Sequence, residues 1–124
     1  MLQNDFLKAG LKLDIRMMDF GELLQRAKAG EHDLVNNGWH SDNGDPDNFL
    51  TPLLGCKDSI NGQNYAKWCN SKFEELIKEA KKVNDPEKRD KLYKLANHIF
   101  YQEQPWINLS YPKFFIVMKK TYED

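Results

Sequence analysis

The sequence predicts an α/β fold, a mixed sheet flanked by helices, with residues 1–124 forming a single domain. Stretches with apolar residues at helical spacing alternate along the chain with stretches that follow a period of two. A length of 124 residues is usual for one domain. The chain is 40% hydrophobic and 30% charged, an ordinary balance for a folded protein.

The first part of the chain predicts a helix, a strand and a second helix. Apolar residues at helical spacing predict the first helix over 2–9. Apolar and charged residues alternate across 11–17, as expected of a half-buried strand. Asp19 and Glu22 form a capping-box-like start for the second helix, which Gly30 ends.

A second, weaker strand is predicted over 33–39. With the preceding strand and helix it would make a βαβ unit with a parallel pair of strands. Residues 40–48 are rich in Asp, Asn and Gly and predict a loop at the carboxyl end of that strand. Ligands of open α/β sheets tend to bind at that end, so this loop is a candidate site.

Residues 49–70 look irregular, with a short helical turn at 49–54. A helix is then predicted from a second capping box, Ser71 and Glu74. Its inward-facing residues are predicted to be Phe73, Leu76, Ile77 and Ala80.

A longer helix is expected after Asp85 as N-cap and Pro86 as first helical residue, ending at Pro105. Residues 106–118 predict a last strand, interrupted at Pro112. The inward-facing residues of the helix are predicted to be Leu92, Leu95, Ala96, Ile99 and Phe100.

Charge and hydropathy exclude several classes of protein. The 18 basic and 19 acidic residues give a formal net charge of −1, which excludes charge-driven binding to nucleic acid or anionic membranes. The longest unbroken apolar stretch, Phe114 to Met118, is far shorter than a membrane span. The N-terminus lacks the pattern of a secretory signal, so we do not expect this chain to encode its own export.

The two cysteines, Cys56 and Cys69, do not complete a zinc site. Two thiols are too few, and His32, His40 and His98 lack the spacings that would supplement them, so no metal is expected. A disulfide that closes an irregular loop fits better and would indicate an oxidising compartment. Two free thiols in a cytosolic protein remain the alternative.

The acidic loop does not match a calcium site, because the spacing of its oxygen ligands is wrong for an EF-hand. Asp45 and Asp47 are expected in a solvated turn, with Asp45 capping a helical turn begun by Pro46. Asp42 differs because it follows Trp39 at the strand exit. A carboxylate there can pair with a cation on a ligand.

The sequence gives little support for catalysis and none for a cofactor. No nucleophile-elbow sequence and no Gly-rich phosphate loop are present. One enzyme hypothesis is a small cytosolic hydrolase or transferase in which Asp42 and His40 act as an acid and base pair. A purely structural or interaction domain is a further alternative.

A longer motif points to a family. Residues 38–49 read GWHSDNGDPDNF, and Cys56 and the NYAKWC stretch at 64–69 follow. This pattern resembles the periplasmic dipeptide-binding proteins of ABC transporters, within the oligopeptide, nickel and haem class of solute receptors. The resemblance extends along nearly the whole chain.

The resemblance implies a fold and a role for the chain. Receptors of this family are longer, two-lobed and exported, so the chain would be most of the carboxy-terminal lobe of a periplasmic protein. It would bind short peptides for an ABC permease, would not be an enzyme, and would carry an incomplete ligand site. Haem- and glutathione-binding receptors of the family are alternatives, and exposed apolar surface makes a dimer of the fragment possible.

The resemblance also implies site residues. Asp42 matches the aspartate that holds the ligand α-ammonium, and the backbone around Gly38, Trp39 and His40 would pair with the peptide group. Phe20 stands where the receptor has a tryptophan that walls the side-chain pocket. The arginine for the ligand carboxylate would lie before Met1. Cys56 and Cys69 would form a disulfide.

Overall fold

The computed structural model describes residues 2–113, 115 and 117, and over these residues the regular elements are helices. No helix in this part of the chain is long and apolar enough to span a membrane. In chain order the helices are α1 (Leu2–Lys8), α2 (Phe20–Ala29), α3 (Asp47–Leu54), α4 (Asp58–Asn61), α5 (Ser71–Ala80) and α6 (Pro86–Glu103).

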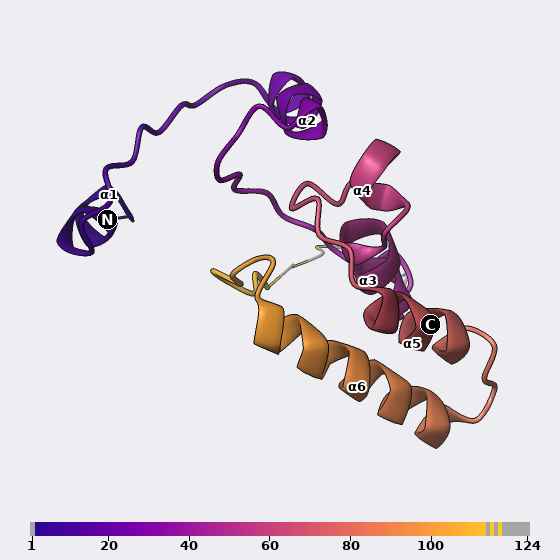
Figure 1. The fold of residues 1–124 in the computed structure, drawn as a ribbon. Coiled ribbons are helices and arrows are strands. Elements are labelled where there is room, and N and C mark those ends of the chain that lie inside the picture. Colours follow the sequence, from indigo (N-terminus) through magenta and orange to yellow (C-terminus); the bar gives the residue numbers. More distant parts are fainter. Residues whose placement is uncertain (1, 114, 116, 118–124) are drawn as a thin grey trace.

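The packed half of the molecule is formed by α3 to α6. Figure 1 shows these helices gathered together, with α5 beside α6, while α1 and α2 stand away on extended connections. Helix α1 has no buried residue, and the one buried residue of α2 is Ala27. The hydrophobic core therefore lies among α3, α5 and α6.

The core is made where α3, α5 and α6 meet. Phe73 and Ile77, one turn apart on α5, are 0% and 1% exposed, and Leu54 of α3 is 1% exposed. The Trp68 ring meets Phe73 edge-on, with 4.9 Å between ring centroids. The buried cluster consists of Leu53, Leu54, Phe73, Ile77, Ala96 and Phe100. The partly buried side chains around it are Trp39, Leu50, Trp68, Leu76, Ile99 and Trp106.

The first two helices form where the sequence predicted them. Gly30 ends α2 in the left-handed conformation, with φ of 78°. Asp19 is the N-cap residue, but its side chain makes no capping hydrogen bond, so the predicted capping box is wrong there. Glu22 instead accepts a hydrogen bond from Arg26, one turn further along, at 2.9 Å.

Helix α5 starts from a different cap than predicted. The N-cap is Asn70 rather than Ser71, and Asn70 Oδ1 accepts from the Phe73 amide at 3.0 Å. Glu74 is drawn away from a capping role, because its carboxylate accepts from the Cys56 amide at 3.0 Å. The same carboxylate lies 3.0 Å from Lys78 Nζ.

Helix α6 begins as predicted and ends at Glu103, two residues before Pro105. Asp85 Oδ1 accepts from the Glu87 amide at 3.0 Å, and Pro86 is the first helical residue. Gln104 ends the helix in a left-handed conformation, with φ of 42°. Leu95, predicted to face inward, is 56% exposed, because the core contacts come from residues one and five positions later.

The described residues do not confirm the predicted strands. Residues 11–17, 33–39 and 106–113 are not strands, and no described neighbour forms a ladder with them. A strand depends on backbone hydrogen bonds from an adjacent strand, and alternation in sequence cannot supply that partner. The mixed sheet is therefore absent from this part of the molecule. Residues 114, 116 and 118 of the last predicted strand lie outside the described residues.

The stretch predicted as irregular, 49–70, contains more helix than expected. Helix α3 takes in Asp47 to Leu54, and the short α4 was not predicted. A disulfide joins Cys56 to Cys69, with 4.7 Å between their Cα atoms, which confirms the disulfide and removes the free-thiol alternative. Closing a loop of this length contributes about 3 kcal/mol of stability in the chain-entropy model.

The disulfide-closed loop is also tied to the end of α6. Trp68 Nε1 donates to one carboxylate oxygen of Glu103 at 2.6 Å, and Asn70 Nδ2 donates to the other at 2.7 Å. Inside the loop, Asn64 is fully buried and its amide nitrogen donates to the carbonyls of Gly55 and Trp68. These hydrogen bonds fix the irregular segment against the core.

Candidate functional site

The acidic loop, residues 40–48, is held by short-range side-chain to backbone hydrogen bonds. Ser41 Oγ accepts from the Gly44 amide at 2.8 Å, and Asn43 Oδ1 accepts from the Asp45 amide at 3.0 Å. Gly44 has a φ of 71°, a left-handed conformation that glycine adopts without strain. The loop is therefore an ordered turn, as its Asp, Asn, Ser and Gly content predicted.

Trp39 anchors the segment that leads into the loop. Its ring is partly buried and packs against the core cluster. Its indole Nε1 donates to the carbonyl oxygen of Asn48 at 2.8 Å. Trp39 thus fixes both ends of the acidic loop, because Asn48 lies in the first turn of α3.

Four of the predicted site residues lie together on this segment. Asp42 is exposed, and its amide donates to Asn48 Oδ1 at 3.2 Å. His40 is also exposed. Gly38 is exposed, with its amide donating to Asn37 Oδ1 at 2.9 Å. Of these residues, Asp42 and Trp39 are joined by hydrogen bonds to Asn48 at the start of α3.

Phe20 is not brought to this loop. It is the first residue of α2 and is 65% exposed. Figure 1 shows α2 well separated from α3, at whose start the acidic loop ends. The described structure therefore gives Phe20 no contact with Asp42 or Trp39.

Asp45 has a structural partner that sequence reasoning missed. Arg89 Nη2, on α6, donates to Asp45 Oδ2 at 2.6 Å and to Oδ1 at 2.9 Å. Arg89 Nη2 also donates to the Tyr93 hydroxyl at 3.1 Å, and the guanidinium lies 5.2 Å from the centre of the Tyr93 ring. Asp45 Oδ1 accepts from the Asp47 amide at 2.8 Å, as expected of a residue at the start of a helix.

Asp47 is also used for structure. Its carboxylate accepts from the Thr51 hydroxyl one turn along α3 and lies 3.1 Å from Lys81 Nζ, just past the end of α5. The carboxylates of Asp45 and Asp47 thus join the start of α3 to α6 and to the end of α5. Asp42, by contrast, is the exposed carboxylate of the acidic loop.

These contacts make the stability of the packed half depend on pH in the acid range. The Asp47 amide and then the Arg89 guanidinium hold the pKa of Asp45 below its ordinary value. A carboxyl group with a depressed pKa stabilises the fold above its unfolded pKa, and that stability is lost as pH falls through the folded pKa. We expect the urea concentration at the unfolding midpoint to decrease as the pH is lowered from 5 to 2, and to decrease less in Asp45→Asn. An equal fall in both proteins would contradict this role for Asp45.

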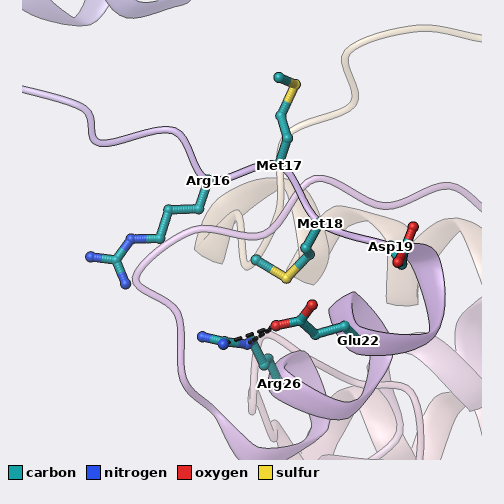
Figure 2. A pocket seen from close by; sticks show the side chains of 6 residues that line it. All are labelled: Arg16, Met17, Met18, Asp19, Glu22 and Arg26. Atoms are coloured by element: carbon teal, nitrogen blue, oxygen red, sulfur yellow. Dashed lines mark hydrogen bonds and ion pairs between the residues drawn. The ribbon is translucent and has the colours of Figure 1, made fainter.

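A hollow lies beside the start of α2, away from the acidic loop. Its volume is about 620 Å³. Figure 2 shows the six side chains that line it. One wall is the ion pair of Arg26 and Glu22, 2.9 Å apart, and Met17 on the other side is 95% exposed. The remaining lining residues are Arg16, Met18 and Asp19. None of the predicted site residues lines the hollow.

Comparisons with known proteins show which proteins the chain is similar to. Residues 1–61 match the middle region of the bacterial extracellular solute-binding proteins, family 5. The chain is 52% identical over 123 residues to "Di/tripeptide-binding protein 4" of Pseudomonas aeruginosa, a match that covers 99% of the chain and 23% of the relative. It is 40% identical over 111 residues to "Heme-binding protein A" of Haemophilus influenzae, which covers 90% of the chain and 20% of the relative.

A solved structure shows the same relationship. The periplasmic binding protein DppA of Helicobacter pylori, solved with the peptide STSA, matches with a TM-score of 0.85 and 34% identity, covering 90% of the chain and 22% of that protein. These matches confirm the resemblance seen in the sequence: the chain is similar to periplasmic dipeptide-binding proteins.

The relationship bears on two earlier predictions. The matching proteins are named as binding proteins, which agrees with the prediction that the chain is not an enzyme and argues against a hydrolase built on Asp42 and His40. The chain spans about a quarter of the length of the curated relatives that it matches.

Proposed function

We propose that the chain is a ligand-contacting part of the carboxy-terminal lobe of a two-lobed periplasmic receptor, which binds di- or tripeptides and delivers them to an ABC permease. The observation that carries this proposal is the exposed Asp42, held by its backbone at the start of α3 beside the core-anchored Trp39. In a cleft closed by a second lobe, its carboxylate would form a charge-assisted hydrogen bond with the peptide ammonium.

Exposed apolar side chains in the last described segment support a larger parent protein. The described residues from 107 to 117 are all exposed, and apolar side chains recur among them with the period of two of a strand. These residues are Ile107, Leu109, Tyr111, Phe115 and Val117, between 61% and 97% exposed. We infer that the remainder of the parent supplies neighbouring strands, which would restore the α/β lobe. In the isolated chain the same exposed side chains favour a dimer.

The ligand class follows from the relatives and from Asp42. A relative with 52% identity is named for di- and tripeptides, and the relative named for haem has 40% identity. An exposed carboxylate suits a free ammonium group, which a peptide carries at its N-terminus. The backbone around Gly38, Trp39 and His40 would pair with the peptide group, and Phe20 would enter the site only in the complete receptor.

A chimera tests the proposed function. In this chimera, the 124-residue chain replaces the corresponding segment of "Di/tripeptide-binding protein 4" of Pseudomonas aeruginosa. We expect the chimera to bind the dipeptide Ala-Ala in calorimetry with a dissociation constant of about 1 μM, while the isolated chain binds much more weakly because its site is incomplete. A folded chimera that does not bind, beside a parent relative that does, would overturn the proposal, as would micromolar binding by the isolated chain.

A further inference from the structure

We propose that Asn48 is the positioning residue of the peptide site, setting the place of both Asp42 and Trp39. The proposal rests on the proposed function and adds to it a residue that contacts no ligand itself. Asn48 lies in the first turn of α3, outside the segment expected to meet the peptide.

Two different groups of Asn48 hold the two site residues. Its side-chain oxygen Oδ1 accepts from the Asp42 amide at 3.2 Å. Its backbone carbonyl accepts from the Trp39 indole Nε1 at 2.8 Å. The side chain therefore controls Asp42, whereas the hydrogen bond to Trp39 does not depend on which side chain occupies position 48.

Asn48 is itself held rigidly. Its amide donates to the Asp45 carbonyl at 3.0 Å, and Asp45 is fixed by Arg89 of α6. The Asn48 side chain is partly buried, whereas Asp42 is exposed. A continuous set of hydrogen bonds thus runs from α6 through the start of α3 to the exposed aspartate.

Loss of the hydrogen bond between Asn48 Oδ1 and the Asp42 amide is expected to affect ligand binding more than folding. If Asn48 Oδ1 is removed, the Asp42 amide can bond to water, so the cost in stability is small. The carboxylate of Asp42, however, would lose its fixed position relative to a bound ammonium. Misplacing a charged group by about 1 Å weakens a charge-assisted hydrogen bond strongly, so the effect should appear in ligand discrimination.

The test compares three variants. Asn48→Leu has a similar volume and no acceptor, Asn48→Asp keeps an oxygen acceptor in the same place, and Asn97→Leu is a matched control at an exposed position of α6. The affinities of the chimeras for Ala-Ala and for N-acetyl-Ala-Ala, which lacks the cation, are measured by calorimetry. Amide hydrogen exchange at Asp42 is measured by NMR in the 124-residue chain itself.

We expect Asn48→Leu to reduce the preference for the free dipeptide at least tenfold and to speed exchange of the Asp42 amide. Asn48→Asp should retain the preference, and Asn97→Leu should leave both readouts unchanged. A merely structural role would weaken binding of both peptides equally, and that result would overturn the inference, as would unchanged exchange at Asp42. If the unsubstituted chimera binds neither peptide, the proposed function fails, whatever the exchange data show.

Discussion

Replacing Asp42 by asparagine in the chimera is expected to weaken Ala-Ala binding by at least 30-fold, because a neutral amide leaves the peptide ammonium without its counter-charge. Removing one partner of a desolvated, hydrogen-bonded charge pair costs about 2 to 5 kcal/mol, and about 1.4 kcal/mol corresponds to a tenfold change. Asp42 is exposed, so the substitution should not alter the melting temperature.

A carboxylate in the same loop provides the control for Asp42. Asp47 is tied to Lys81 and Thr51, so Asp47→Asn removes an equal charge within the acidic loop without touching the expected ligand position. We expect Asp47→Asn to change the affinity for Ala-Ala by less than threefold. Equal losses in the two variants would indicate a general effect of negative charge and would contradict a direct contact from Asp42.

The second large effect concerns stability. Phe73→Ala should destabilise the packed half by about 3 to 5 kcal/mol, since Phe73 is 0% exposed and packs edge-on against Trp68. Small proteins are stable by roughly 5 to 15 kcal/mol, so this loss removes a large share of the total. Urea unfolding followed by helical circular dichroism measures it.

The matched control for Phe73 lies in the last described segment. Phe115 is 86% exposed, and Phe115→Ala should change the free energy of unfolding by less than about 0.5 kcal/mol. If both substitutions cost the same, the core would not be centred on α5. If Phe73→Ala cost less than about 1 kcal/mol, the chain would not be packed in solution as described.

Local signals in the sequence predicted the helices well. Asp85 and Pro86 mark the start of α6, and Gly30 marks the end of α2, because capping and left-handed conformations depend on neighbouring residues alone. Leu95 shows the limit of the helical pattern. Its spacing fits an inward face, but the face that α6 turns toward α5 is set by tertiary packing.

Strands were the part that sequence could not settle. Leu11, Ile15 and Met17 alternate as a strand would, yet they are between 51% and 95% exposed. Alternation records which face would be buried, but a strand also needs a partner that offers backbone hydrogen bonds. No such partner is found among residues 2–113, 115 and 117.

That Gly38, Trp39, His40 and Asp42 meet a ligand stays a prediction from the motif. The structure shows hydrogen bonds that join Trp39 and Asp42 of this segment to Asn48 at the start of α3. Arg89 and Asn48 were missed as supports of the site. Arg89 meets Asp45 across 44 positions of sequence, a pairing that no local pattern indicates. The role of Asn48 becomes visible only through its hydrogen bonds.

The central claim is that Asp42 gives the receptor its preference for a free peptide ammonium. The most direct measurement is the ratio of the chimera's affinities for Ala-Ala and for N-acetyl-Ala-Ala, with and without Asp42→Asn. We expect at least a 30-fold preference for the free dipeptide, and nearly none in the variant. Equal affinity for the two peptides in the unsubstituted chimera would contradict the assignment of Asp42 to the ligand ammonium.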